Sequence, residues 1–123
     1  MDITSILLTI QSLLTNDPLT KEPGYTNSTG EINERYNTCV EFETFRTLIV
    51  KNSLEIPYGL EEFKPHIINH FKENFESILE RYKSISEEKN NRTVMVSVYN
   101  INLHIDYSKL LEIYNCEIRK LIQ

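Results

Sequence analysis

Few side chains in this sequence could carry out covalent or metal chemistry. The cysteines, Cys39 and Cys116, lie far apart and lack metal-ligand spacing. Cys39 adjoins the apolar face of a helical pattern, where burial raises the pKa of a thiol and makes it inert, so we expect two thiols and no nucleophile. His66 and His70 are four residues apart on a predicted helix, but Ile67 occupies the place where a zinc-protease motif has glutamate. We expect neither a metal nor another cofactor.

The composition excludes several classes of partner. A length of 123 residues allows one modest domain, residues 1–123. With 18 acidic and 13 basic residues the net charge is −5, which argues against nucleic-acid binding, since that needs clustered lysine and arginine. No apolar run approaches the roughly 20 residues of a membrane span, and no secretion signal opens the chain. The sequence therefore predicts a soluble cytoplasmic protein that does not contact a membrane.

A first helix is predicted to begin at Ile3, with Asp2 as its cap. Residues 16–18, Asn-Asp-Pro, end it, because the residue before a proline is pushed out of helical geometry. A loop then extends to about Gly30. The apolar residues at helical spacing are called the stripe: Ile3, Ile6, Leu7, Ile10, Leu13 and Leu14.

Two longer helices follow in the middle of the chain. One runs from about Glu31 to about Asn52, with Ser28 or Thr29 as a candidate cap. Its inner side is predicted to carry Ile32, Tyr36, Val40, Phe45, Leu48 and Ile49. After a break at residues 57–59, Pro-Tyr-Gly, the next helix has Pro65 in its first turn or at a kink. Its apolar pattern consists of Leu60, Phe63, Ile67, Phe71, Phe75, Ile78, Leu79 and Tyr82.

The end of the chain combines a β element with a last helix. Residues 84–92 are polar and predict a helix end or a linker. Residues 93–105 alternate as strands do, with a change of phase near Asn100 that predicts a bulge or a tight reversal. Residues 107–122 return to helical spacing. The predicted fold class is mostly α with a small β element.

Several motifs in residues 3–82 resemble a known enzyme family. The stretch from Ile6 to Tyr25 contains Glu22-Pro23-Gly24-Tyr25, and further matches follow at residues 36–37 (Tyr-Asn), at Phe63 and Ile67, and at residues 70–71 (His-Phe). Together they resemble the C-terminal helical half of ubiquitin-conjugating enzymes (E2 enzymes, with the UBC fold), closest to the large hybrid E2/E3 branch. The catalytic cysteine, the His-Pro-Asn motif, the β-meander and the N-terminal helix of that family are missing. Residues 83–123 form an extension that the resemblance does not cover.

The resemblance implies roles for three residues. In conjugating enzymes the donor ubiquitin folds back on the outward face of the helix after the cysteine, and the matching positions are Leu8 and Ser12. Leu8 lies opposite the stripe at 100° per residue, so we expect it to be exposed, although a single exposed leucine is common on protein surfaces. Glu22 matches the gate residue before the loop proline, where a carboxylate positions an incoming lysine and accepts its proton. The alternative to this gate role is that Glu22 is a solvated glutamate of the loop.

Three functions remain open from the sequence. The chain is a remnant or split part of a conjugating enzyme, whose cysteine-bearing half lies upstream or in a partner chain; or it is a non-catalytic module that binds ubiquitin or a ubiquitin-like modifier; or it is an unrelated helical structural or interaction protein. Without a catalytic cysteine it should not form a ubiquitin thioester alone. The stripe has no β-meander to pack on, so residues 83–123 or another subunit must cover it, and a homo-oligomer is expected where those residues do not.

Overall fold

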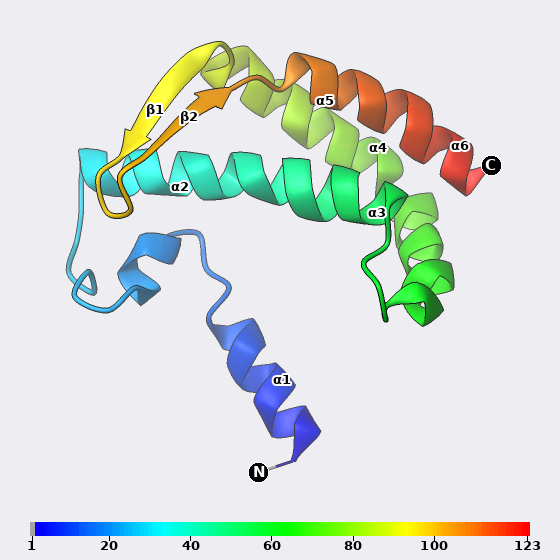
Figure 1. The fold of residues 1–123 in the computed structure, drawn as a ribbon, viewed down its shortest axis with the longest axis horizontal. Coiled ribbons are helices and arrows are strands. Elements are labelled where there is room, and N and C mark those ends of the chain that lie inside the picture. Colours follow the sequence, from blue (N-terminus) through cyan, green and yellow to red (C-terminus); the bar gives the residue numbers. More distant parts are fainter. Residues whose placement is uncertain (1) are drawn as a thin grey trace. The chain divides into compact units, whose positions relative to one another are not determined.

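The computed structural model of this protein describes residues 2–123 and is mostly helical with one two-stranded antiparallel sheet, which confirms the predicted fold class (Figure 1). The elements are α1 (Ile3–Ser12), α2 (Glu31–Glu43), α3 (Asn52–Leu54), α4 (Lys64–Lys89), β1 (Arg92–Val96), β2 (Ile101–Ile105), α5 (Ser108–Ile113) and α6 (Arg119–Ile122). Short 3-10 helices cover Pro18–Lys21 and Glu61–Phe63, and π-helical segments cover Thr44–Lys51 and Tyr114–Ile118. No helix among the described residues is long and apolar enough to cross a bilayer.

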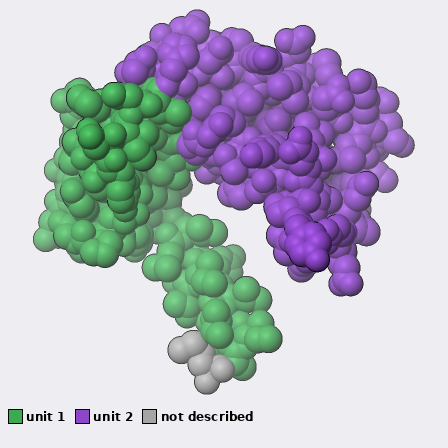
Figure 2. Space-filling view, in the orientation of Figure 1, with its two compact units in different colours: residues 1–41, 94–103 green, residues 42–93, 104–123 purple. Residues whose placement is uncertain are grey.

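The chain forms two compact units (Figure 2). The first contains the residues up to Glu41 together with Val94–Leu103, and the second contains Phe42–Thr93 together with His104–Gln123. The expected division at residue 82 rests on the resemblance alone and stays a prediction.

In the first unit, α1 begins as predicted. The carboxylate of Asp2 accepts a hydrogen bond from the backbone N–H of Ser5 at 2.7 Å, which satisfies one of the unpaired donors at the helix start. The helix ends at Ser12, four residues before the predicted stop, and Pro18 starts the 3-10 helix that follows. None of the described residues of α1 is buried, and the side chains of the stripe are exposed.

The second predicted helix is continuous from Glu31 to Leu54, close to the predicted 31–52, but its middle is π-helical. Phe45 is buried as expected, whereas the predictions for Val40 and Leu48 are wrong, because both side chains are exposed. A π-helical turn contains an additional residue compared with an α-helical turn, so the residue that follows Phe45 on the inner side is Val50. A regular helical period places Leu48 and Ile49 there instead.

An aromatic cluster forms the core of the second unit, where α4 lies beside the helix that continues from α5 to α6 (Figure 1). The ring of Phe45 stacks on Tyr82 at 4.0 Å between centroids, and Phe75 stacks on Tyr114 at 4.8 Å. The Tyr114 hydroxyl donates to the backbone oxygen of Phe75 at 3.2 Å, so this buried polar group is satisfied. Pro65 lies in the first turn of α4, one of the two places predicted for it.

The β element is a hairpin with a reversal at residues 97–100, one of the two predicted explanations for the change of phase. Asn100 has φ +52°, in the left-handed region that asparagine tolerates, and its N–H faces the Ser97 carbonyl oxygen at 3.4 Å. Val94, Val96 and Ile105 are buried. One face of the hairpin therefore packs inward, as alternation predicts.

Candidate functional site

Hydrogen bonds to the Asp17 side chain hold the loop that carries Glu22 against α2. Both carboxylate oxygens of Asp17 accept hydrogen bonds from the Asn33 side-chain amide at 3.0 Å, and one accepts from that of Asn37 at 2.8 Å. The Asn33 amide also donates to the Ser28 backbone oxygen, and its own oxygen accepts from the Ser28 hydroxyl. Asn33 is only 6% exposed, so these bonds satisfy a buried polar side chain. Ser28, a candidate cap, is thus bonded to a side chain of the helix.

Glu22 lies in a small cluster with two tyrosines in the first unit. Its carboxylate accepts hydrogen bonds from the Tyr36 hydroxyl at 2.7 Å and from the Tyr99 hydroxyl at 2.8 Å. Tyr36 comes from α2 and Tyr99 from the turn of the hairpin, and their ring centroids are 6.4 Å apart. The cluster therefore joins three segments of the unit.

These hydrogen bonds change the acidity of all three side chains. The bonds from Tyr36 and then Tyr99 stabilise the ionised carboxylate and hold the pKa of Glu22 below its usual value. Burial, followed by the bond to Glu22, raises the pKa of Tyr36 to about 12. The bond to Glu22, followed by burial, raises the pKa of Tyr99. A carboxylate that is held ionised by two donors is a weaker base, so Glu22 in this arrangement is not suited to remove a proton.

The cluster predicts a pH dependence of stability. Because the pKa of Glu22 is lower in the folded state, its contribution is present above the unfolded value of 4.5 and is lost as the pH falls through the folded value. The raised pKa of Tyr36 acts in the opposite direction, so its contribution is complete below pH 10.0 and is lost as the pH rises to about 12. Urea unfolding across both pH ranges measures these losses.

The double variant Tyr36→Phe and Tyr99→Phe tests whether the cluster causes this pH dependence. It keeps both rings but removes both donors to Glu22, so we expect a weaker acid dependence and a weaker alkaline dependence than in the unchanged protein. Unchanged profiles at both ends would contradict the role assigned to the cluster.

The two residues matched to ubiquitin contact lie together on α1. Leu8 and Ser12 are one helical turn apart and both are exposed, Leu8 by 60%. The Ser12 hydroxyl donates to the Thr9 backbone oxygen at 2.6 Å, which leaves its oxygen able to accept. The prediction that Leu8 is exposed is confirmed, but the stripe on the opposite side is exposed as well. Exposure alone therefore does not distinguish the two faces.

The remaining candidates for chemistry lie apart from this cluster. Cys39 is buried, Cys116 is exposed, and no disulfide joins them. His66 and His70 belong to the second unit, where they line an apolar groove. Within residues 2–123 no three histidine, cysteine, aspartate or glutamate side chains are grouped as a metal site would require.

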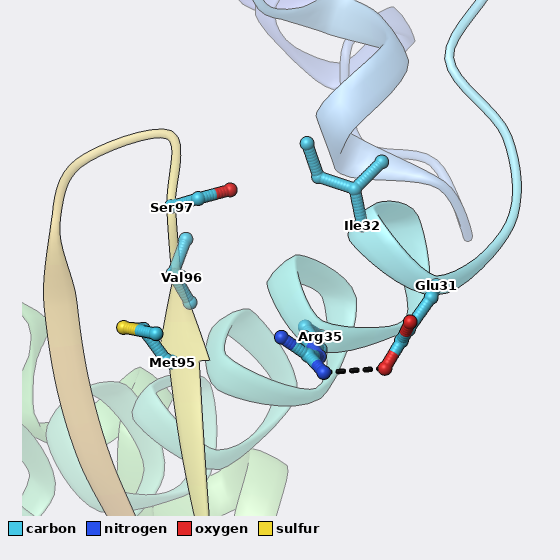
Figure 3. A pocket seen from close by; sticks show the side chains of 6 residues that line it. All are labelled: Glu31, Ile32, Arg35, Met95, Val96 and Ser97. Carbon is cyan, nitrogen blue, oxygen red and sulfur yellow. Dashed lines mark hydrogen bonds and ion pairs between the residues drawn. The ribbon is translucent and has the colours of Figure 1, made fainter.

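Among the described residues, each unit has a hollow. The hollow in the first unit has a volume of about 140 Å³, and Figure 3 shows Val96 and Ser97 of the hairpin on one side and Ile32 and Arg35 of α2 on the other. Arg35 forms an ion pair with Glu31 there. This volume is below the roughly 300 Å³ of common ligand pockets. The hollow in the second unit, called the groove, has a volume of about 360 Å³.

Reasoning from the sequence missed Tyr99 and Asn33. Tyr99 lies 77 residues from Glu22, and no local pattern links them. Asn33 follows a loop that contains Asp17 and Ser28, whose side chains are common hydrogen-bonding partners in turns, which is the only signal that could have indicated its role. The likeness of residues 3–82 to conjugating enzymes rests on the quoted motifs. Neither a family model nor a curated protein matches this chain.

Proposed function

We propose that this chain is a non-catalytic binding protein of the ubiquitin pathway, acting in the cytoplasm, in which α1 presents Leu8 and Ser12 to ubiquitin or a ubiquitin-like modifier. The proposal combines the resemblance of residues 3–82 to conjugating enzymes with the exposure of this helix. The observation that carries it is an exposed Leu8 with the exposed Ser12 one turn away, on a helix without charged residues.

The chemistry of α1 suits an apolar partner surface. No residue from Ile3 to Ser12 is charged, so docking requires no charge to be removed from water. The exposed Leu8 has Ser12 one turn away, and Ser5 and Thr9 are also nearby on the helix. An apolar centre with a polar rim is the common composition of a protein interface.

Two further observations support a function without chemistry of its own. Cys39 is buried, which disfavours attack on a thioester, and burial of a cysteine is typical of a structural role. Glu22 is held by two tyrosine hydroxyls, so the gate role implied by the resemblance would need a rearrangement beside the cysteine of another chain.

Titration with ubiquitin tests the proposal. Adding unlabelled ubiquitin to the ¹⁵N-labelled protein should shift the backbone resonances of Leu8 and Ser12, and Leu8→Ser should weaken binding by about tenfold or more, because a buried leucine contributes roughly 1.5–3 kcal/mol. Leu14→Ser is the control, since it replaces another exposed leucine on the stripe and should leave ubiquitin binding unchanged. If no α1 resonance moves, the proposal fails.

A thioester assay with E1, ATP and ubiquitin on the same preparation addresses the non-catalytic part. A non-reducing gel should contain no reducible adduct of the chain. An adduct that Cys116→Ser removes would assign a nucleophile to this exposed cysteine and would contradict that part of the proposal.

A second candidate is a helical interaction protein unrelated to conjugating enzymes. The observation that favours it is the exposed stripe, because an apolar helix face without a partner marks an interaction surface. This candidate would be favoured if substitutions in the stripe abolished binding to another protein and if ubiquitin caused no change in the resonances of the chain.

A further inference from the structure

The described chain leaves two apolar surfaces uncovered. One is the stripe on and just after α1, in the first unit. The other is the groove of the second unit, which is lined by Leu48, Ile49, Ser53, Phe63, His66, Ile67, His70, Phe71 and Ile78. Exposed apolar side chains gathered in one place often mark an interaction site.

The groove lies between the π-helical segment Thr44–Lys51 and the first half of α4. Leu48 is 61% exposed and Phe63 is 56% exposed, while Phe71 is buried. None of its lining residues is an acid, a lysine or an arginine. The one buried polar residue, Ser53, donates its hydroxyl hydrogen to the Leu48 backbone oxygen at 3.4 Å. The groove therefore favours an apolar, uncharged occupant.

The α1 helix is apolar, uncharged and short enough to bind in this groove. Ile3–Ser12 contains no charged residue, and its stripe supplies large aliphatic side chains at helical spacing. Ten helical residues span about 15 Å, and the part of α4 from Lys64 to Ile78 spans about 22 Å at the same rise per residue. The helix thus fits within the length of the groove, in the common mode in which an amphipathic helix binds an apolar groove.

We propose that the occupant of the groove is α1 of a second copy of this chain. Each copy carries both surfaces, so two copies can exchange their α1 helices reciprocally and bury the stripe and the groove twice. This arrangement is closed by two-fold symmetry and adds no further copies. It leaves Leu8 and Ser12, on the opposite side of α1, available for the partner assigned under the proposed function.

Sedimentation velocity over a range of concentrations tests the dimer. The unchanged protein should be a dimer that dissociates on dilution. Each copy carries a net charge of −5, so adding salt should strengthen the dimer, because the screening length falls from about 30 Å at 0.01 M to about 3 Å at 1 M. A protein that stays monomeric at every concentration would overturn the inference.

Variants on both surfaces identify the contact. Leu7→Ser on the stripe and Leu48→Ser in the groove replace exposed side chains, so the monomer should still fold, as circular dichroism can verify. Each change alters both contacts of the dimer, and at about tenfold per contact the dissociation constant should rise by about a hundredfold. Leu8→Ser is the matched control and should leave the dimer intact. Phe63→Ser provides a second groove variant should Leu48→Ser fail to fold.

Mixing the two single variants gives the sharpest result. The Leu48→Ser copy has an intact α1 and the Leu7→Ser copy has an intact groove, so a mixture should form a heterodimer with one unaltered contact. The other contact carries both changes. If Leu7 packs against Leu48, the second change there costs little beyond the first, and the heterodimer should be stronger than either variant alone. A groove variant that still dimerises would overturn the inference in favour of contacts between α1 helices, and so would a mixture without heterodimers. Loss of ubiquitin binding in Leu8→Ser with the dimer intact would separate this inference from the proposed function.

Discussion

Replacing Phe45 with alanine should lower the free energy of unfolding by about 3–5 kcal/mol, the usual cost of removing a buried aromatic side chain. Phe45 is 0% exposed. Its ring stacks on Tyr82 at 4.0 Å and has its centroid 5.7 Å from that of Tyr114 and 6.0 Å from that of Tyr107. The small side chain would leave a cavity that these rings cannot close without moving. Small domains are stable by only about 5–15 kcal/mol, so the loss would be a large part of the total.

Urea unfolding followed by circular dichroism measures this effect, with Leu48→Ala as the control. Leu48 belongs to the same π-helical segment but is 61% exposed, so its replacement should change stability by no more than about 0.5 kcal/mol at concentrations where the chain is a monomer. Equal losses in the two variants would show that the aromatic cluster is not the centre of this unit.

Replacing Asp17 with alanine should lower the free energy of unfolding by about 3 kcal/mol. The change removes the acceptor of the hydrogen bonds from Asn33 and Asn37, and bonds to a charged group contribute about 1.5–3 kcal/mol each. The buried amide of Asn33 keeps only its bond to the Ser28 backbone oxygen as a donor. The loop from Asp17 to Ser28 should then exchange its amide hydrogens faster.

Hydrogen exchange and urea unfolding measure the two parts of this prediction. Glu34→Ala removes a carboxylate from an exposed position of α2 close to Asn33, so it serves as the control and should have an effect within about 0.5 kcal/mol. If Glu34→Ala loosened the loop as much as Asp17→Ala, net charge and not the hydrogen bonds would be responsible.

The helices could be predicted because apolar periodicity and helix-ending residues are local signals, whereas the change of phase near Asn100 left both a bulge and a tight reversal open. Helix positions followed from the spacing in the sequence, and residues such as Pro65 mark ends. Which side chains face inward could not be predicted as well. Val50 is 4% exposed whereas Leu48 is 61% exposed, because the π-helical turn changes the spacing after Phe45. Single-residue changes of period give no compositional signal.

The candidate site could be predicted only in part. The resemblance points to Glu22, but the bonds of Glu22 to Tyr36 and Tyr99 depend on how distant segments fold together. Asn33 is a polar residue at a buried position, which apolar patterns do not identify. Side-chain hydrogen bonding across a loop depends on geometry that the order of residue types does not contain.

The π-helical segments at Thr44–Lys51 and Tyr114–Ile118 have a consequence for the variation of chain length. A turn with hydrogen bonds from residue i to i+5 can lose one residue and become an ordinary α-helical turn. After such a deletion between Phe45 and Val50 the two would be four residues apart and would still share a face. A homologue of this protein can therefore differ by a one-residue deletion inside a helix, while the residues on both sides keep their places in the core.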